Sequence, residues 1–278
     1  MPELPEVEIM ARNLDRWTAG RVLTGVTVVD ERVDSGGVVA WSAGAAGQTV
    51  GRSWRRAKYA VTEVGSRVLV LHFRMTGKVV AAEPGTRKAE RLVLHLAPEA
   101  GRPDAVVFDD ARHLGNAWVR PREGLDTWFS HDRKLGPEPW PMRRPAAFWH
   151  HQLGHTRRPV KVALMHQESI AGIGNILASE VLWRARIDPK RPARDLTTAD
   201  WERVAEAVAG VVDDTLARDS GDEIAYVNSR GGSTRGVASP FSVYRCEGQP
   251  CPRCAAPVER FKQSGRSTFW CATCQGST

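Results

Sequence analysis

Two closely spaced cysteine pairs near the C-terminus constrain the fold of this chain more than any other feature of its sequence. Cys251 and Cys254 form one C-x-x-C pair, Cys271 and Cys274 form the second, and residues 255–270 separate them. Two such pairs can surround a zinc ion tetrahedrally from the turns of a β-hairpin. Redox-active dithiols are the alternative, but two matched pairs at this separation favour the metal. We therefore predict one structural Zn²⁺ site.

A zinc ion would also explain how so short a module folds. Residues 241–278 are too few to bury a sufficient hydrophobic core, so a bound metal would supply folding energy. The remaining cysteine, Cys246, lies outside the pattern and is expected to be a spare thiol. No cysteine precedes it, which argues against a secreted protein stabilised by disulfide bonds.

Length and charge narrow the functional class. The 278 residues suffice for two domains, and a hydrophobic content of 42% excludes a disordered chain. Lys and Arg number 39 against 32 Asp and Glu, and the net charge of +7 favours a polyanionic partner, although a mildly basic soluble enzyme is the alternative. There is no apolar run of about 18 residues to span a membrane. The acidic start lacks a signal-peptide pattern, so we expect a cytoplasmic protein.

The hydrophobic pattern predicts a helix followed by a β-sandwich in the first half of the chain. Apolar residues recur at helical spacing over 3–18, and acidic residues lie near the positive end of the helix dipole. Short β-branched runs follow, punctuated by Gly, Pro and charged residues, as in an antiparallel sandwich. These runs are 22–29, 59–64, 68–73, 92–96, 106–108 and 117–119.

The second half has the pattern of a linker, several helices and the metal module. The prolines in 131–150 indicate a linker, and the glycine-containing segment around 231–236 is expected to be a loop. Helical stretches are predicted over 158–166, 174–186 and 198–217. The expected domains are a catalytic 1–130, the linker 131–150, a helical 151–240 and the zinc finger 241–278.

The turn between the first two of these helices could bind an anion. Gly172 and Gly174 permit a tight turn that exposes backbone amides at the start of the next helix, where the helix dipole adds positive charge. Asn175 can cap that helix or donate to a phosphate, and Lys161 lies on the preceding helix. Many helix pairs have a glycine-containing turn, so the motif alone does not establish a site.

Basic residues also lie between the second and third cysteines of the metal module. Gly265 and Arg266 fall at the tip of the expected hairpin, where one guanidinium could reach a phosphate or a groove. The alternative is a solvated basic surface.

The N-terminus combines an imino acid with two carboxyl groups. After removal of Met1, Pro2 would present a secondary amine, and α-amino groups are partly neutral at pH 7. Its attack on C1′ of a sugar gives an iminium ion that has no N–H to lose and so remains an electron sink for elimination. Glu3 and Glu6 could move protons beside it. An ordinary helix start is the alternative.

Together these blocks resemble the formamidopyrimidine-DNA glycosylase family, which includes endonuclease VIII. The first eight residues, Met-Pro-Glu-Leu-Pro-Glu-Val-Glu, are similar to the start of formamidopyrimidine-DNA glycosylase, and endonuclease VIII usually has Gly in place of Leu4. The similarity covers nearly the whole chain in order. Further matching blocks are 55–59, 71–72, 75–77, 135–139, 172–176, 178–180 and the zinc finger.

The resemblance implies an α+β, bilobal fold. An N-terminal β-sandwich with flanking helices would be followed by a C-terminal helix-two-turn-helix domain with the zinc finger. Damaged double-stranded DNA would lie in the cleft between the lobes with its lesion flipped out of the stack. The resemblance further implies a monomer that is associated with the nucleoid and not with a membrane.

The implied activity is that of a bifunctional DNA glycosylase and AP lyase of base-excision repair. It would remove oxidised purines (8-oxoguanine and formamidopyrimidines) by glycosidic hydrolysis and then cut the strand by β,δ-elimination. Pro2 would be the Schiff-base nucleophile, Glu3 would protonate the deoxyribose ring oxygen, and Glu6 would support the site by hydrogen bonding. Lys58 would bind phosphate and assist near the abasic sugar.

The resemblance also implies DNA-binding residues in both lobes. Asn175 and Arg266 would bind the phosphates that flank the lesion, and His72 and Lys161 are further candidates for DNA contacts. Met75 would fill the gap left by the flipped base.

Two segments depart from the family pattern. The family usually has Asp-Pro-Arg-Arg-Phe-Gly in the loop that enters the DNA, whereas 110–115 is Asp-Ala-Arg-His-Leu-Gly. Arg112 could still hydrogen-bond the orphaned partner base, and Leu114 could still push between bases but lacks a flat stacking face. The segment 222–242 lacks the sequence expected for 8-oxoguanine recognition, and Arg245-Cys246 stands where Gly-Arg is usual. We therefore hypothesise an altered lesion range.

Three alternatives remain at this point. An endonuclease VIII-like enzyme for oxidised pyrimidines is disfavoured by Leu4 and weakly favoured by the lost Phe wedge. A protein that recognises lesions without cutting would not need the N-terminal amine. A zinc-ribbon nucleic-acid protein would not account for the N-terminal block.

Overall fold

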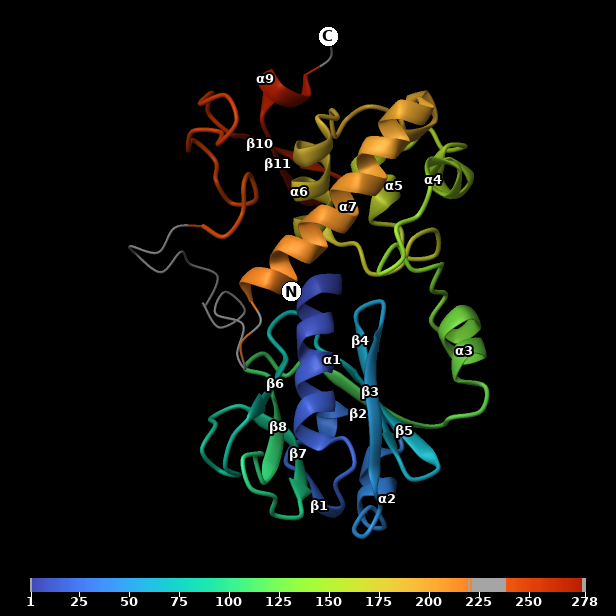
Figure 1. Cartoon of the computed structure of the whole chain (residues 1–278), viewed down its shortest axis with the longest axis vertical. Coiled ribbons are helices and arrows are strands. Elements are labelled where there is room, and N and C mark those ends of the chain that lie inside the picture. Colours follow the sequence, from blue (N-terminus) through green and yellow to red (C-terminus); the bar gives the residue numbers. More distant parts are fainter. Residues whose placement is uncertain (1, 220, 222–238, 277–278) are drawn as a thin grey trace. The chain divides into compact units, whose positions relative to one another are not determined.

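The protein folds into two compact units, each with its own core. The computed structural model describes residues 2–219, 221 and 239–276. Within these, unit 1 comprises 2–132, 216–219 and 221, and unit 2 comprises 133–215 and 239–276 (Figure 1). The glycine-containing segment around 231–236 and most of the divergent 222–242 segment lie outside the described residues.

Unit 1 begins with helix α1 (Leu4–Thr18), which its apolar periodicity predicts. Glu3 is the N-cap and forms a capping box with Glu6, each side chain accepting the other residue's backbone N–H. Val7, Leu14 and Trp17 of the same helix are buried in the core of unit 1. The same helix therefore buries an apolar stripe and fixes two carboxylates at its start.

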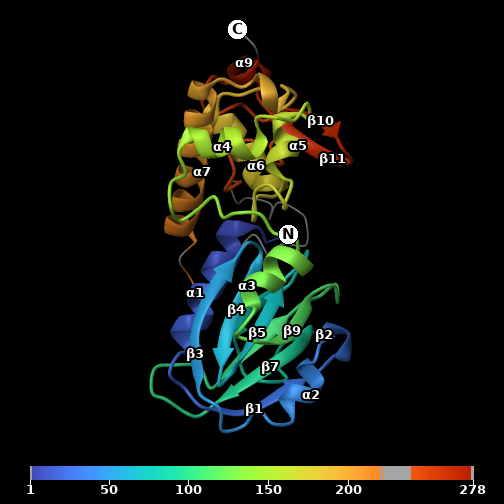
Figure 2. The same cartoon turned by 90° about the vertical axis from the view of Figure 1, so that its right-hand side faces the viewer.

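Two sheets form the sandwich of unit 1 (Figure 2). The five-stranded sheet has the order β2-β9-β5-β4-β3, the four-stranded sheet has the order β1-β7-β8-β6, and all pairs are antiparallel except β2 with β9. Inward-facing apolar residues of both sheets share one core with α1. The strands are β1 (Leu23–Val28), β2 (Asp34–Gly36), β3 (Val50–Arg56), β4 (Tyr59–Val64), β5 (Arg67–His72), β6 (Lys78–Ala81), β7 (Glu90–Leu96), β8 (Ala105–Asp109) and β9 (Asn116–Pro121).

The sequence pattern identified six of these nine strands and missed β2, β3 and β6. Strand β3 carries several arginines, and only Val50 and Ser53 on it are buried, so it lacks an apolar run. Strands β2 and β6 are three and four residues long. This is too short for the two-residue alternation of apolar and polar side chains to be recognised. Short helical segments complete unit 1: η1 (Glu31–Val33), α2 (Val38–Ser42), α3 (Leu125–Thr127) and η2 (Trp128–Asp132).

Unit 2 is helical and carries the metal module. The predicted helical stretches correspond to α5 (Val160–Leu164), α6 (Asn175–Ala185) and α7 (Thr198–Arg218), joined by η3 (Ala193–Asp195). The segment expected as a linker belongs to unit 2 from Arg133 onward, and α4 (Ala146–Leu153) begins within it. The indole of Trp140 donates to Asp213 on α7 at 3.0 Å, so this proline-containing stretch is held against the helices.

The module at the end of unit 2 is a hairpin followed by a single helical turn. Strands β10 (Glu259–Gln263) and β11 (Arg266–Trp270) pair antiparallel, and α9 (Ala272–Gln275) follows. Ser264 and Gly265 form the hairpin loop, both with positive φ (48° and 76°), as a two-residue turn requires. Among all helices that the structure describes, none combines the length and apolar character of a membrane span.

Candidate functional site

Several predicted site residues meet at one end of the five-stranded sheet. Lys58 lies in the two-residue loop of the β3–β4 hairpin. Tyr59 at the start of β4 pairs with His72 at the end of β5, and their ring centroids are 4.6 Å apart. His72 pairs in turn with Asn116, the first residue of β9. Lys58 and His72 therefore lie at the same end of this sheet.

Helix α1 brings the N-terminus to this same end. In the last turn of the helix, the Asp15 carboxylate accepts from the backbone N–H of Ser53 at 2.7 Å. One turn from the start of the helix, Glu8 pairs with Arg55 at 3.1 Å, closer to the hairpin loop. The helix thus runs antiparallel to β3, and its first turn points toward the loop that carries Lys58 (Figure 1).

The first turn of α1 holds two buried carboxylates beside Pro2. The backbone N–H of Glu3 donates to Glu6 Oε2 at 2.6 Å, and both residues are 2% exposed. Pro2 is also buried and directly precedes the N-cap. This arrangement keeps carboxyl groups next to the chain end, where they can transfer protons to and from a group bound there.

The loop that carries Lys58 is fixed to the helix rather than mobile. The Arg55 side chain is 3% exposed, pairs with Glu8 and donates from Nη1 to the carbonyl oxygen of Ala57 at 3.1 Å. Ala57 has a φ of 53°, a left-handed conformation that this contact supports. The buried guanidinium of Arg55 therefore links the loop that carries Lys58 to helix α1, which Pro2 and Glu3 precede.

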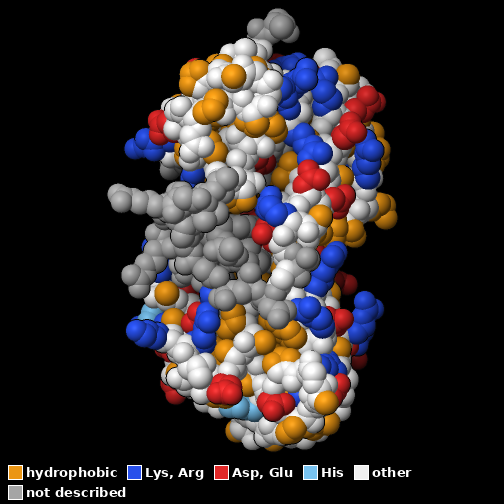
Figure 3. All heavy atoms as spheres, turned by 60° about the vertical axis from the view of Figure 1, so that its left-hand side comes forward, with side chains coloured by type: hydrophobic (Ala, Val, Ile, Leu, Met, Phe, Trp, Pro, Cys, Tyr) orange, Lys and Arg blue, Asp and Glu red, His pale blue; other side chains and the backbone are white. Residues whose placement is uncertain are grey.

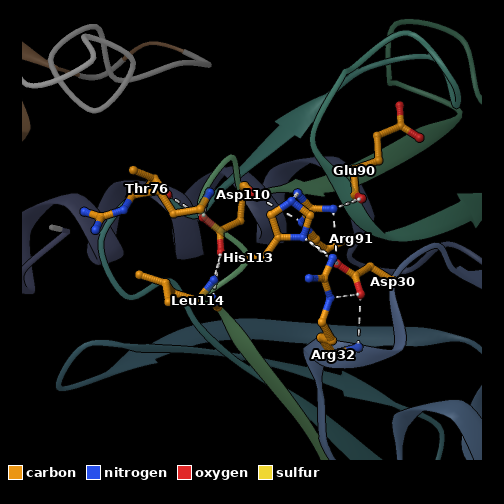
Figure 4. A network of polar contacts seen from close by, with 10 residues as sticks. Asp30, Arg32, Thr76, Glu90, Arg91, Asp110, His113 and Leu114 are labelled. Atoms are coloured by element: carbon orange, nitrogen blue, oxygen red, sulfur yellow. Dashed lines mark hydrogen bonds and ion pairs between the residues drawn. The ribbon is translucent and has the colours of Figure 1, made fainter.

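A single buried carboxylate joins the two loops that carry the exposed apolar side chains Met75 and Leu114. Met75 and Leu114 are 43% and 42% exposed, whereas Asp110 is fully buried (0%). Asp110 accepts from Thr76 Oγ1 at 2.5 Å and from the backbone N–H groups of Leu114 and Gly115, both at 2.7 Å. Figure 4 shows Thr76 and Leu114 on either side of this carboxylate. The loop after β5 and the loop after β8 are thereby joined at the end of unit 1 that carries the other candidates.

Asp110 is a residue whose role the sequence did not reveal. In the sequence it is only the first residue of the 110–115 loop, which we call the wedge loop. It also accepts from the backbone N–H of Arg112 at 3.2 Å, so the residue expected to face the partner base is tied to the same carboxylate. An acidic residue five positions before a glycine is a weak signal, because only the fold shows that its oxygens face inward.

In unit 2, Lys161 is the centre of a polar contact between three elements. It is 1% exposed, and its ammonium donates to Asn175 Oδ1 (2.7 Å), the Ser267 carbonyl (3.2 Å) and Thr268 Oγ1 (2.8 Å). These partners lie on α6 and β11, while Lys161 lies on α5. An ammonium has three donors. The geometry thus orients the groups around it, and a direct DNA contact by Lys161 stays a prediction.

Asn175 and Arg266 lie close to this buried ammonium. Asn175 is the first residue of α6 and donates from Nδ2 to the Ser267 carbonyl at 3.0 Å. Arg266 is exposed at the start of β11, next to the hairpin loop. Gln167 braces the preceding turn, since it accepts from the Gly172 N–H at 3.0 Å and donates to the Ile173 carbonyl at 2.7 Å.

A hollow of about 210 Å³ opens between α5 and the hairpin loop of unit 2. Its lining includes the cationic side chains of Lys161, Arg266 and Arg158, and none of its lining residues is acidic. Such a hollow suits an anion the size of a phosphate. Arg158 was not singled out from the sequence, because a single arginine before a short helix carries no pattern of its own.

Charge alone does not locate this site. On the face drawn in Figure 3, Lys and Arg side chains lie on both units with Asp and Glu side chains among them. The motifs and their contacts therefore indicate the DNA-binding surface, whereas the distribution of charge does not.

The four predicted metal ligands form one cluster. The Sγ atoms of Cys251, Cys254, Cys271 and Cys274 all lie within 4.8 Å of one another, with Cys251–Cys274 at 3.9 Å and Cys254–Cys271 at 3.4 Å. A tetrahedral zinc site with bonds of about 2.3 Å has sulfur–sulfur edges of about 3.8 Å. The donor set therefore fits a structural Zn²⁺, as predicted.

The contacts of one ligand, Cys251, favour its thiolate, whereas burial raises the pKa of Cys271 and of Cys274. Burial raises the pKa of the Cys251 thiol, but the backbone N–H of Arg253 and the indole of Trp183 outweigh burial and lower that pKa to about 6. The Trp183 indole lies 3.3 Å from Cys251 Sγ. Cys246 is buried beside the cluster in the small core of this module but is not part of the ligand set, as the spacing suggested.

Three family profiles match the chain in order. The formamidopyrimidine-DNA glycosylase N-terminal domain matches residues 1–117, and the formamidopyrimidine-DNA glycosylase H2TH domain matches 135–225. The zinc finger found in FPG and IleRS matches 248–276. Together they cover the sandwich, the helical region and the cysteine module.

Curated relatives match over the full length. A formamidopyrimidine-DNA glycosylase of Chloroflexus aurantiacus is 34% identical and covers 99% of this chain and 98% of its own. The enzyme of the same name from Parasynechococcus marenigrum is 35% identical, with 99% and 100% covered. That of Streptococcus mutans is 30% identical, with 99% of each chain covered.

Solved structures show the same fold. Lactococcus lactis Fpg in complex with DNA containing an abasic site superimposes with a TM-score of 0.85 at 25% identity, covering 99% of this chain and 100% of that one. MutM bound to DNA with carbocyclic 8-oxo-G gives a TM-score of 0.83 at 25% identity and the same coverage. The α+β architecture and the helix-two-turn-helix region with its zinc finger agree with the expected fold class.

Proposed function

This chain belongs to the formamidopyrimidine-DNA glycosylase family, and on that premise we propose that it excises damaged bases and cuts the strand with Pro2 as its nucleophile. The observation that carries the proposal is the buried capping box of Glu3 and Glu6 directly beside Pro2. Binding without catalysis would need neither the imino terminus nor two carboxylates held next to it.

The proposed chemistry follows from these groups. With Met1 removed, the Pro2 nitrogen forms a bond to C1′ of the damaged nucleotide, the bond from C1′ to the base breaks, and the amine proton passes to the departing base. Glu3 protonates the ring oxygen of the sugar as its bond to C1′ breaks, which gives the iminium. Loss of a proton from C2′ then expels the 3′-phosphate, and loss of a proton from C4′ expels the 5′-phosphate. Glu6 keeps Glu3 in place through the N–H that it accepts, and Lys58 neutralises phosphate charge near the sugar.

DNA would be held by both units. Asn175 and Arg266 would bind phosphates beside the cationic hollow, with Lys161 orienting Asn175. In unit 1, His72 would contact the backbone, while Met75 and Leu114 would occupy the space that the flipped nucleotide leaves. We infer damaged double-stranded DNA as the partner of a monomeric, nucleoid-associated enzyme whose catalytic domain is 1–130.

Oxidised purines are the proposed first substrates. Relatives that carry the name formamidopyrimidine-DNA glycosylase match over the full length, and one structural neighbour holds carbocyclic 8-oxo-G in its DNA. The zinc ion, when bound, supplies structural stability to the finger and takes no part in the reaction.

An altered lesion range is the second candidate, favoured by Leu114. This exposed side chain stands where the family usually has Phe, and an aliphatic wedge gives up base stacking. Lactococcus lactis Fpg, with a TM-score of 0.85 at 25% identity, has been solved with DNA containing an oxidized pyrimidine. The wedge would therefore bias the range toward lesions that unstack easily.

Borohydride trapping on two duplexes tests the proposal. One carries 8-oxoguanine opposite cytosine and the other carries an abasic site. Trapping on both would support the iminium chemistry and the purine substrate. Trapping on the abasic duplex alone would support the lyase and move the lesion toward thymine glycol or another pyrimidine product. If neither duplex is trapped although both bind and Met1 is absent, the chain is a lesion-binding protein and the proposal is wrong.

A further inference from the structure

His113 lies between the two residues of the wedge loop that are expected to meet DNA. Arg112 precedes it and Leu114 follows it. Its backbone has a φ of 55°, a conformation in which a residue with a Cβ is strained. Such strain persists only where surrounding contacts hold it. The side chain of His113 supplies these contacts.

The imidazole bridges the partly buried carboxylate of Asp30 and the buried guanidinium of Arg91, which lie on different elements. Nδ1 lies 2.8 Å from Asp30 Oδ2, and Nε2 lies 2.6 Å from Nη2 of Arg91 on β7. The neutral tautomer with its proton on Nδ1 satisfies both contacts, because it donates to the carboxylate and accepts from the guanidinium. We call Asp30, Arg91 and His113 the clamp; Figure 4 shows His113 between the other two.

Arg32 is a second cation at the same ring. Its Nη2 approaches Nδ1 at 2.5 Å, and its Nε pairs with Asp30 at 2.8 Å. In one tautomer Nδ1 bonds to either Asp30 or Arg32, not both. The Arg32 side chain is 68% exposed and that of Asp30 is 12% exposed, so the carboxylate is the better-ordered partner.

Arg91 connects the clamp to the base of the wedge loop. Its side chain is 9% exposed and pairs with Asp30 at 3.2 Å. Its Nε donates to the carbonyl oxygen of Asp110 at 2.9 Å. The carboxylate of Asp110 in turn accepts from the N–H of Leu114. Hydrogen bonds therefore hold the wedge loop at its first residue, Asp110, and again at His113. Arg112 lies between these two points.

We propose that His113 is a positioning residue that, through Asp30 and Arg91, fixes the wedge loop in the shape that inserts Leu114 and Arg112 into DNA. This proposal rests on the proposed function for its DNA substrate. It assigns part of lesion opening and of partner-base contact to a group that touches neither the reacting sugar nor Pro2.

The test separates wedge insertion from the reaction at Pro2. The probe for insertion is a duplex with a tetrahydrofuran abasic analogue opposite 2-aminopurine, whose fluorescence rises when the base is unstacked. The probe for chemistry is single-turnover borohydride trapping on a natural abasic site at saturating full-length protein. Wild-type trapping checks the proposed function by itself, and the fluorescence of the analogue complex needs no reaction.

Three variants isolate the clamp. His113→Gly removes the ring and relieves the strained backbone, and His113→Ala removes the ring but keeps the strain. Asp30→Asn keeps the shape of the carboxylate and removes its charge. His95→Ala is the matched control, since His95 is a half-buried histidine of β7 whose ring bonds to Thr27 at 2.8 Å and not to the wedge loop.

We expect both His113 variants to bind the analogue duplex about tenfold more weakly, with a smaller fluorescence rise, as for the loss of one charge-assisted hydrogen bond. Trapping at saturation should stay within about twofold of wild type. Adding Asp30→Asn to His113→Gly should cost less than Asp30→Asn costs in the wild type, because the two changes share the Asp30–His113 contact while the Asp30–Arg91 pair is lost in either background. The control should match wild type.

Two results would overturn the proposal. Variants with wild-type affinity and fluorescence would show that the clamp does not set the wedge. An equal loss of fluorescence and of trapping would show a general defect of unit 1 rather than a positioning role. If His113→Gly fails to fold, Asp30→Asn alone is measured with the same two probes, and the same two results would overturn the proposal.

Discussion

The two units orient their candidate residues with groups of opposite charge. In unit 1, buried carboxylates accept backbone N–H groups: Glu3 and Glu6 close the first turn of α1, and Asp110 closes the wedge loop. In unit 2, the buried ammonium of Lys161 donates to three acceptors around Asn175, and a cysteine cluster fixes the hairpin beside it.

This difference suggests a division of labour. A carboxylate that holds a chain end in place can also transfer protons, so Glu3 and Glu6 of unit 1 are suited to the reaction itself. A buried cation consumes acceptors and leaves amide and guanidinium donors for an anion, so the machinery of unit 2 serves phosphate binding. Changes in the first turn of α1 should therefore affect the reaction more than affinity, and changes around Lys161 in unit 2 the reverse.

Loss of the metal should have the largest effect and should fall on binding. A structural zinc contributes about 10–16 kcal/mol to folding of such a module. Cys271→Ser should lose zinc and weaken binding to an abasic-analogue duplex by about 100-fold, because the hairpin that carries Arg266 unfolds. Fluorescence anisotropy and zinc analysis measure the two effects.

Cys246→Ser is the control for the metal variant, since Cys246 is buried in the same module outside the ligand set. It should keep zinc and affinity. Undiminished binding by Cys271→Ser would contradict the assignment of phosphate binding to unit 2.

Glu3→Gln should affect the reaction instead. The amide oxygen can still accept the Glu6 N–H, so the capping box and the melting temperature should change little. Removal of the proton donor should slow trapping by about 100-fold at saturating protein, with affinity unchanged. Glu31→Gln, at an exposed glutamate of η1, is the control. A comparable loss of affinity would break the proposed division of labour.

Lys161→Met should weaken binding by about tenfold and reduce the free energy of unfolding by about 2–3 kcal/mol, because it removes three buried hydrogen bonds and only the Ser267 carbonyl keeps the Asn175 amide as a partner. Lys190→Met is a matched control on the same unit. Lys190 lies over the rings of Phe261 and Trp270 at 4.6 and 4.4 Å, so its loss should cost about 1 kcal/mol and leave affinity unchanged. Equal affinities of the two variants would argue against the ordering role of Lys161.

The smallest expected effect is on the acid stability of unit 2. Burial raises the pKa of Asp200, but hydrogen bonds from Thr197 and the charges of Arg191 and Arg203 outweigh burial and lower it. A lowered folded-state pKa gives stability that is present at neutral pH and is lost as the pH falls through that pKa. Asp200→Asn should therefore lower the melting temperature at pH 7, and the difference in melting temperature between variant and wild type should become smaller in acid. A difference that stays constant with pH would contradict this.

The sequence predicted the elements with strong periodic patterns and the sites with strict spacing. Helix α1 and the cysteine cluster follow from local order, since i, i+4 spacing and C-x-x-C pairs need no tertiary information. Strand β3 was missed because its arginines interrupt any apolar pattern, and the burial of the Arg55 side chain is explained only by its partner Glu8 on α1. Arg91 and Asp30 were missed for the same reason: each lies far in sequence from the loop that it holds.

Lys161 illustrates a different limit. Its position before the glycine turn identified it as a DNA-contact candidate, but sequence alone cannot say whether an ammonium faces solvent or protein. The fold buries it against Thr268 of the metal module, a contact across more than a hundred residues. The orienting role of Lys161 therefore follows only from the structure, and its contact with DNA stays a prediction.

The central claim is that the amine of Pro2 forms the covalent bond with DNA. The most direct test is borohydride trapping of the wild-type protein on an abasic duplex, followed by protease digestion and mass spectrometry of the cross-linked peptide. We predict that the adduct lies on the N-terminal peptide, at Pro2, with Met1 absent. An adduct on Lys58 or another lysine, or a retained Met1 in the trapped species, would contradict the account.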